Sequence, residues 1–291
     1  MTVIRTRLLF TLFLTMLTCR AASAQVDLVG TWVGINNQEA TDRGGGPRMV
    51  DYTGIPLNEE GRAKALSYSP NVYGQIERQC VHYNPSYTLI GPFGFPIQNE
   101  YDSAGNIVAI VIGSWVDKGP MAIWMDGRPH PPEWAPATWM GFSTGKWEGD
   151  ILVVSTTHIK QEWIRRNGIP NSDRSTMIEH FIRHGSTLTH LVQWTDPVNL
   201  TEPLVRSEDF VLQERSAGSW LWPCEYVDEV VDRPRDEVPH YLPEKSPYAG
   251  DFAYRYGIPV EAAAGGAATM YPEYQERLRT LPRPPKPAGS K

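Results

Sequence analysis

Short β-like runs joined by tight turns constrain the fold of this chain more than any other feature of its sequence. The runs are rich in apolar, β-branched and aromatic residues, and the turns between them are rich in Gly, Asp, Asn and Ser. Two such runs on either side of a short turn predict a β-hairpin with antiparallel strands. The expected hairpins pair 97–101 with 107–115, 138–147 with 151–159, and 176–184 with 187–194. Successive hairpins favour a mainly β fold, an antiparallel meander that is closed or nearly closed.

Three further runs and three short helices complete the expected elements. The additional strands are 28–35, 121–125 and 204–212. A helix is expected over 58–66, because Asn58 can cap its first turn and two acidic residues follow the cap. Two more helices, 251–256 and 271–281, are expected to pack on the outside of the strands.

The first expected strand contains Gly30-Thr31-Trp32, which resembles the G-x-W element that opens the first strand of lipocalin-like barrels. Together with the meander that follows, this resemblance implies a lipocalin-like (calycin-type) barrel with short peripheral helices. The alternative is that Trp32 simply closes one end of a β-core.

The first residues have the organisation of a secretory signal peptide, expected at 1–24. Two arginines precede a short apolar run, and Ala22-Ser23-Ala24 matches an A-x-A cleavage pattern. The run is too short and wrongly flanked for a membrane span, and no later stretch is long and apolar enough for one. We therefore expect a periplasmic or secreted protein with no membrane partner.

The mature chain is expected to form one domain with extensions. The barrel with its loop decorations would cover 25–245, a helical extension packed on it 246–281, and a Pro-rich disordered tail 282–291. Cys80 and Cys224 remain after cleavage, an even pair in an oxidising compartment. They form either a disulfide or two buried thiols, since the sequence does not give their separation.

The charge of the mature chain argues against polyanionic partners. The sequence has 27 basic and 33 acidic residues, and the leader holds three of the basic residues and no acid. Cleavage therefore leaves 24 basic residues and a net charge of −9. An acidic secreted protein is a poor candidate for binding nucleic acid or an anionic membrane surface.

Several longer motifs resemble a family of uncharacterised secreted proteins of soil bacteria. The motifs are DGRPHP at 126–131 and GKWEGDILVV at 145–154, and the resemblance covers nearly all of the mature chain. Related members carry Glu-Arg-Phe-Arg-Arg at 179–183, so Glu179 and Arg183 keep the pattern and His180 departs from it. No general activity is associated with the family, so the resemblance implies no reaction.

The loop that follows the run 121–125 is the first candidate site. Three prolines stiffen it, and rigid loops at strand ends commonly carry catalytic groups. His130 is the candidate proton shuttle and Asp126 its orienting carboxylate, while Arg128 is a candidate clamp for a substrate carboxylate or carbonyl. The alternative is an Asp-Gly turn in which Arg128 and His130 bind the backbone.

Strand alternation predicts a second group of candidates. Glu179, Phe181 and Arg183 share one side of the run 176–184, so a carboxylate and a guanidinium lie on the same wall. The pair either orients a neighbouring imidazole or forms a structural salt bridge that plugs one barrel end. His158, expected on the same face as 152, 154 and 156, completes the catalytic candidates. Trp124 and Trp139 are candidate substrate-binding rings.

Metal and nucleophile chemistries find little support. His180 and His184 are four apart in an expected strand, which separates them by roughly 13 Å, too far to chelate one ion. A G-x-S-x-G elbow, a Gly-rich phosphate loop before a helix and an H-E-x-x-H motif are all absent from the sequence. We predict no metal and no cofactor; the alternative is a metal site made by His130, His158 and a carboxylate, which spacing rules do not detect.

Two functions follow from these patterns. The first is a secreted β-barrel enzyme that uses His and carboxylate general acid–base chemistry on a small apolar or aromatic molecule, as a hydrolase, lyase or isomerase. The second is a lipocalin-like protein that binds such a molecule without turnover. The enzyme hypothesis requires His130, His158 and Glu179 to point to one place.

Overall fold

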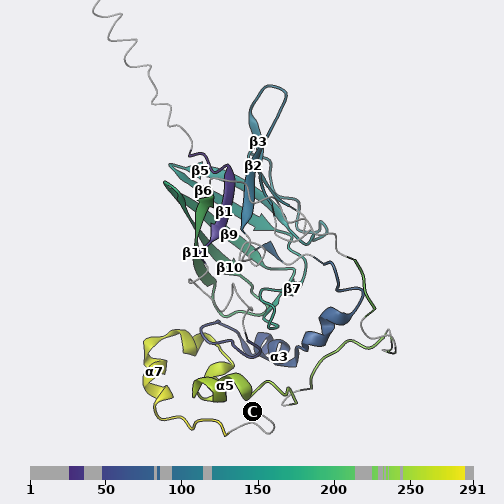
Figure 1. Cartoon of the computed structure of the whole chain (residues 1–291), viewed down its shortest axis with the longest axis vertical. Coiled ribbons are helices and arrows are strands. Elements are labelled where there is room, and N and C mark those ends of the chain that lie inside the picture. Colours follow the sequence, from purple (N-terminus) through teal and green to yellow (C-terminus); the bar gives the residue numbers. More distant parts are fainter. Residues whose placement is uncertain are drawn as a thin grey trace, which may run out of the picture.

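The hairpin-rich middle of the chain closes into a nine-stranded barrel (Figure 1). The computed structural model describes residues 26–35, 48–81, 84–85, 94–113, 120–213, 225–228, 232, 234, 236–242 and 245–285. The barrel strands are β1 (Gly30–Gly34), β2 (Phe95–Tyr101), β3 (Ile107–Ile112), β4 (Met121–Trp124), β5 (Phe142–Glu148), β6 (Ile151–Thr157), β9 (Thr176–His184), β10 (Thr187–Thr195) and β11 (Leu204–Gln213). The predicted mainly β fold, a closed barrel of lipocalin-like type, is confirmed.

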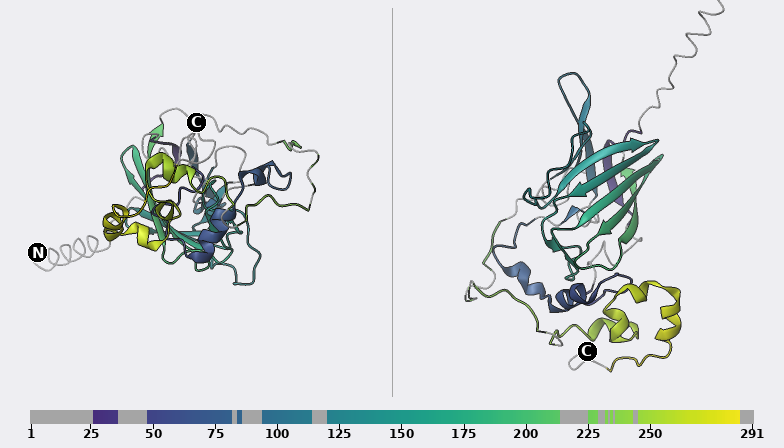
Figure 2. Two further views of the ribbon diagram at one scale, coloured as in Figure 1. Left: turned by 90° about the horizontal axis from the view of Figure 1, so that it is seen from below. Right: turned by 180° about the vertical axis from the view of Figure 1, so that it is seen from behind.

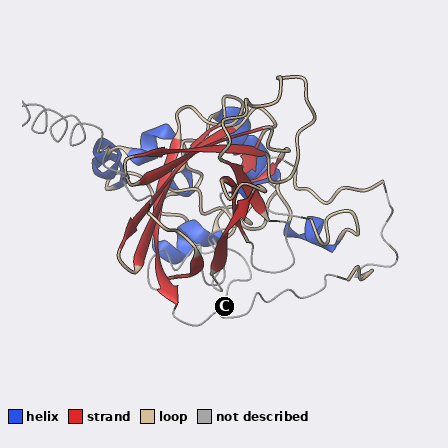
Figure 3. Cartoon of the chain, turned by 90° about the horizontal axis from the view of Figure 1, so that it is seen from above, coloured by secondary structure: helices blue, strands red, loops and turns tan. Residues whose placement is uncertain are grey.

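The strands follow one another around the barrel almost in sequence order. The closed order is β1-β11-β10-β9-β6-β5-β4-β3-β2, and the strands curve around a common axis when seen from above (Figure 3). The meander departs from a purely antiparallel one where β4 and β5 pair in parallel. A long connection separates these two strands and lets the chain return to the starting end of β4 before β5 begins.

A second departure lies between β6 and β9. There the chain leaves the barrel and forms a small two-stranded sheet, in which β7 (Glu162–Trp163) pairs with β8 (Pro170–Asn171). The expected strand 151–159 ends earlier, at Thr157, because His158 has a φ of 57° and turns the chain away. The β2–β3 hairpin, by contrast, projects past the other strands at one end of the barrel (Figures 1 and 2).

Strand alternation fills the barrel with apolar side chains on one side. The inner residues of β1 to β4 are buried and apolar: Trp32, Phe95, Ile97, Ile110, Ile112, Met121 and Ile123. Packing is tight beside this wall, since a Cβ at Gly145 would lie 2.5 Å from Met125 Sδ and 2.8 Å from Ile123 Cγ2. Only glycine fits at that point of β5.

Helices cover the barrel end opposite the β2–β3 hairpin (Figures 1 and 2). The elements are α3 (Glu59–Ser67), η1 (Pro70–Gly74), α5 (Asp251–Tyr256), α6 (Val260–Ala263), η2 (Ala267–Met270) and α7 (Pro272–Leu278). Asn58 caps α3 as predicted, because its side chain accepts a hydrogen bond from Gly61 N. The C-terminal helices join the segment next to α3 through the hydrogen bonds Tyr52 N to Ala263 O and Gly266 N to Ile55 O.

Some expectations fall on residues that are not described. The expected signal peptide at 1–24, the end of the expected tail and Cys224 lie outside the described residues. The pairing of Cys80 with Cys224 therefore stays a prediction. Within the described ranges, no helix is long and apolar enough to cross a bilayer.

Candidate functional site

The inner wall formed by β9, β10 and β11 is polar, unlike the apolar wall opposite it. Four titratable or charged side chains lie on it: Glu179, His190, Arg206 and Glu208. All four are at most 9% exposed, and Glu179 is completely buried. Their placement follows from alternation, because each occupies the buried face of its own strand, two residues from at least one buried apolar residue. Burying charged groups is costly unless they are paired, so the contacts of this wall decide what it does.

The centre of the polar wall is a hydrogen bond of 2.8 Å between Glu179 Oε1 and His190 Nε2. The imidazole of His190 also stacks on Phe181, with ring centroids 4.7 Å apart and planes inclined by 22°. Beside this pair, Arg206 Nε lies 3.1 Å from Glu208 Oε1. The carboxylate and the aromatic ring together fix the orientation of His190.

Two polar atoms of this wall, both buried, lack hydrogen-bond partners within the described part of the chain. They are Glu179 Oε2 and Trp194 Nε1. Val192 is the residue of β10 opposite Glu179, and Trp194 lies two residues further along β10 on the same inner face. A buried acceptor and a buried donor left unsatisfied each cost free energy of about 1–3 kcal/mol. The wall is therefore complementary to a group that offers both a donor and an acceptor.

The polar wall does not form a recognisable metal site. No group of three or more His, Cys, Asp or Glu side chains among the described residues is placed to hold a metal ion. His180 follows Glu179 directly in β9, and successive side chains of a strand point to opposite faces, so His180 lies on the outer face. What the wall can do is accept a proton or a hydrogen bond at Glu179 and His190.

The predicted site residues His130 and His158 lie together, but on the outer surface of the barrel. Thr157 Oγ1 is 2.8 Å from His130 Nδ1 and 2.7 Å from His158 Nδ1. His130 Nε2 is 2.9 Å from Thr144 Oγ1, and His158 Nε2 is 3.0 Å from the carbonyl oxygen of Pro132. The two histidines thus anchor the proline-rich loop to β5 and β6.

One hydrogen bond of this network has a fixed direction: a carbonyl oxygen only accepts, so His158 Nε2 donates to Pro132 O. The two ring nitrogens of His130 are held by the hydroxyls of Thr157 and Thr144. Burial, with the nearby His158 second, lowers the pKa of His130 below its ordinary value. The lowered pKa favours the neutral form of His130, and the contacts of both histidines are consistent with a structural role.

Asp126 does not orient His130. Its carboxylate instead accepts hydrogen bonds from Arg128, with Oδ1 2.8 Å from Nε, and this contact holds the pKa of Asp126 below its usual range. The guanidinium of Arg128 lies 3.6 Å from the ring centroid of Trp124. Arg128 thus lies between the Asp126 carboxylate and the Trp124 ring on the barrel surface, and its side chain binds that carboxylate and not the backbone of the turn alternative. Trp139 stacks under Lys160 Nζ at 4.3 Å.

Arg183 closes one end of the barrel. It lies 5.5 Å over the ring of Trp32 and donates hydrogen bonds to the carbonyl oxygens of Gly185 and Asp27. Trp32 Nε1 donates to Leu28 O at 2.9 Å, so the N-terminal segment seals the same end. Arg183 has no ion pair with Glu179 among the described contacts. Arg183 therefore plugs one barrel end, as the structural alternative predicted. Its partners are the Trp32 ring and two backbone carbonyls, and not the carboxylate of Glu179.

The structure does not bring Glu179 and His130 together. Glu179 is opposite Val154 on β6 and points inward, whereas Thr157 and Thr144, which hold His130, are on the outward alternation of β6 and β5. The barrel wall separates the two groups. Strand alternation predicted which residues share a face of the barrel wall. The loop that carries His130 has no such alternation, so the sequence did not predict whether His130 lies inside or outside the barrel.

Sequence reasoning missed His190, Arg206 and Glu208. Their signal was present, because His190 interrupts an otherwise apolar stripe of Leu188, Val192 and Trp194. The same interruption occurs on β11 between Leu204 and Phe210. A titratable residue within a buried stripe on each of three neighbouring strands is the pattern that identifies this wall.

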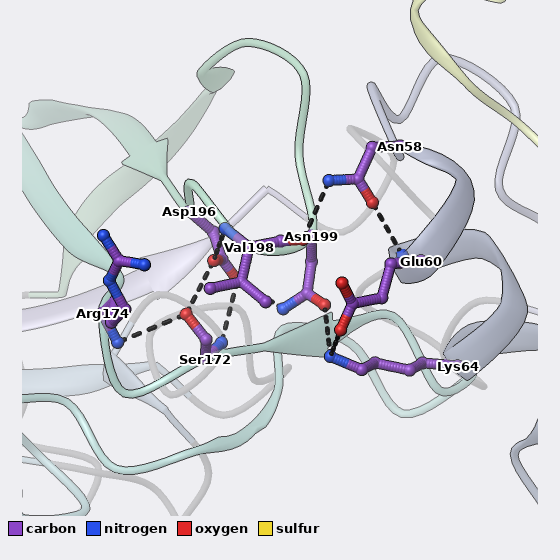
Figure 4. Close-up of polar contacts among 9 residues, drawn as sticks. Asn58, Glu60, Lys64, Ser172, Arg174, Asp196, Val198 and Asn199 are labelled. Atoms are coloured by element: carbon purple, nitrogen blue, oxygen red, sulfur yellow. Dashed lines mark hydrogen bonds and ion pairs between the residues drawn. The ribbon is translucent and has the colours of Figure 1, made fainter.

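A second buried polar cluster is fully satisfied and structural (Figure 4). Asp196 is 2% exposed and accepts four hydrogen bonds, from Ser172 N and Oγ, Val198 N and Asn199 Nδ2. Asn199 Oδ1 in turn accepts from Lys64 Nζ at 3.2 Å. The cluster ties α3 to the loops at the covered end of the barrel and leaves no oxygen of Asp196 for a ligand.

Comparisons of this chain with protein-family models, with curated proteins and with solved structures found no match. The site is therefore interpreted from its own geometry.

Proposed function

We propose that this protein binds a small organic molecule inside its barrel, against the polar wall of β9 to β11. The observation that carries the proposal is the buried Glu179 Oε2, which has no hydrogen-bond partner among the described residues. A donor on the ligand would satisfy this oxygen, and an acceptor would satisfy Trp194 Nε1. The apolar wall opposite suits an apolar or aromatic body. A phenol, an aryl amine or an aliphatic alcohol has this combination.

Binding of the neutral aryl amine N-phenyl-1-naphthylamine tests the proposal. Its fluorescence rises in an apolar site, and its N–H can donate to Glu179. Glu179→Gln removes the anionic acceptor, and Trp194→Phe removes the indole donor while keeping an aromatic ring. Loss of one hydrogen bond should weaken binding about tenfold for Glu179→Gln, since ~1.4 kcal/mol is one decade in Kd. The control is Glu148→Gln, a carboxylate on the outside of the same barrel.

Two outcomes would contradict the binding proposal. One is the absence of saturable binding to a protein that is folded by circular dichroism. The other is equal affinity in Glu179→Gln and Glu148→Gln, which would locate the probe away from the polar wall.

A second candidate function, general acid–base catalysis, is favoured by the Glu179–His190 pair. A carboxylate that holds an imidazole at 2.8 Å is the arrangement by which proton-transferring histidines are oriented. The pair replaces the His130 and His158 of the sequence-based hypothesis. Hydrolysis of 4-nitrophenyl acetate that disappears in His190→Gln and survives in His184→Gln would support this candidate. Binding of the ester without release of 4-nitrophenol would leave the protein a binder.

We also propose that the chain is secreted, on the basis of the expected leader at 1–24. Expression of the full chain in a Gram-negative host, followed by fractionation and N-terminal sequencing, checks this. A mature protein that begins at Gln25 in the periplasmic fraction is expected, whereas an intact Met1 in the cytoplasm would contradict it.

A further inference from the structure

A cleft of about 520 Å³ lies outside the barrel, between α3, η1, the β7–β8 sheet and the segment 238–240. Its volume is in the range of small-molecule sites. The cleft shares no residue with the polar wall inside the barrel. It is therefore a separate place in the molecule where a ligand could bind.

Basic side chains dominate the charge of this cleft. Lys64, Arg78 and Lys160 line it, with Glu162 as the one acidic lining residue. Lys64 is already paired with Glu60 beside the cleft, with Nζ 2.7 Å from Oε1. Glu162 has a side-chain exposure of 5% and pairs with Arg78 at 2.8 Å, so this carboxylate is shielded behind the guanidinium. Lys160 is exposed and has no carboxylate partner within the described residues. In a chain with an excess of acid, such a cleft attracts a small anion.

Aromatic rings form the floor of the same cleft. Tyr68 and Trp163 meet edge to face, with ring centroids 5.2 Å apart. Arg78 lies over Trp163, with its guanidinium carbon 5.1 Å from the ring centroid. Rings beside cations favour a ligand that is both planar and negatively charged.

The far wall of the cleft is a short extended segment held by the backbone. Tyr68 and His240 form an isolated β-bridge, and Tyr241 N donates to Ser67 O at 2.7 Å. His240 Nδ1 donates to Val238 O, which leaves Nε2 available to a ligand. The cleft therefore has a fixed wall as well as a floor.

We propose that this cleft is a second binding site, which takes a small aromatic carboxylate. The ring packs on Trp163 and Tyr68, and the carboxylate pairs with Lys160, the exposed lysine of the cleft that has no carboxylate partner within the described residues. The inference does not depend on the ligand proposed for the barrel, because it uses different residues and a ligand of different charge.

Isothermal titration with 2-naphthoate, and with 2-naphthamide as the uncharged equivalent, tests the proposal. We expect saturable binding of 2-naphthoate that weakens at high salt. Lys160→Gln should raise the Kd about five- to tenfold, and Lys146→Gln, an exposed lysine on β5, should leave it unchanged. Both lysines are exposed, so both variants are expected to fold, which a thermal melt verifies.

Three results would overturn the second site. They are equal affinity for the amide and the carboxylate, equal effects of the two lysine variants, and a loss of 2-naphthoate binding in Glu179→Gln. The last result would place the probe in the barrel and would leave the barrel proposal standing. Conversely, loss of N-phenyl-1-naphthylamine binding in Glu179→Gln with unchanged 2-naphthoate binding would support two separate sites.

Discussion

At the scale of single residues, the buried Glu179–His190 pair has a consequence for the stability of the fold. Both side chains are at most 1% exposed, and each supplies the other's hydrogen-bond partner, so removal of one leaves the other buried and unpaired. Glu179→Ala should therefore lower the free energy of unfolding by about 3–5 kcal/mol, as the loss of one partner of a buried pair does. Urea denaturation measures the change, with Glu148→Gln expected to stay within ~0.5 kcal/mol of the unmodified protein. A loss for Glu179→Ala no larger than that of the control would show that the pair does not stabilise the fold.

The outer histidines give a pH dependence with a definite sign. The pKa of His130 is lowered in the folded protein, so the unfolded chain takes up the proton first as the pH falls. The stability that neutral His130 contributes is fully present above its unfolded pKa of about 6.5 and is lost as the pH falls through that value and then the folded pKa. We expect the drop in urea midpoint from pH 7.5 to pH 5 to be smaller in His130→Gln than in His184→Gln. Equal drops in the two variants would exclude His130 as a source of this dependence.

At the scale of elements, the sequence predicts local pairing well and long connections poorly. The expected strand 176–184 has the bounds of β9, because its alternation and the Gly185-Ser186 turn agree on one register. The parallel contact of β4 with β5 and the β7–β8 sheet were not predicted, because they depend on long connections that carry no periodicity. The candidate site shows the same contrast between strand residues, which the sequence predicts well, and loop residues, which it predicts poorly. Alternation predicted that Glu179 shares a face with Phe181, which the structure shows to be the inner face, whereas the outward position of His130 depended on how its loop folds back.

Helix α3 depends on its cap. Asn58 Oδ1 accepts from Gly61 N at 2.8 Å, and its Nδ2 donates to Val198 O at 2.8 Å, so one side chain both starts the helix and joins it to the Asp196 cluster. Asn58→Ala should cost about 1–2 kcal/mol, a typical loss for an N-cap. Asn58→Asp keeps the cap acceptor and removes only the donor to Val198, so it should cost less. Thermal melts compare the two variants, and an Asp variant no better than the Ala variant would show that the cap acceptor is not the stabilising contact.

At the scale of the whole molecule, a buried tyrosine joins α3 to the loop between β7 and β8. The hydroxyl of Tyr52 shares its one proton between two carbonyl oxygens, Ala65 O at 2.8 Å and Asn167 O at 3.0 Å. Burial raises the pKa of this hydroxyl far above its ordinary value. Tyr52 is therefore a neutral, fully buried donor that ties the helix to this loop.

One measurement on the cysteines tests both the predicted disulfide and the predicted removal of the leader. Cys224 lies outside the described residues, so its bridge to Cys80 stays a prediction. A crosslink over so long a loop would restrict the unfolded chain, so Cys80→Ser should lower the free energy of unfolding by about 2–4 kcal/mol. Alkylation of the denatured, unreduced protein from the periplasmic fraction, read by intact mass, should label no thiol, and alkylation after reduction should label two. Two labelled thiols before reduction would exclude the bridge. One labelled thiol before reduction would indicate Cys19, and hence a leader that had not been removed, because Cys19 is the remaining cysteine of the sequence.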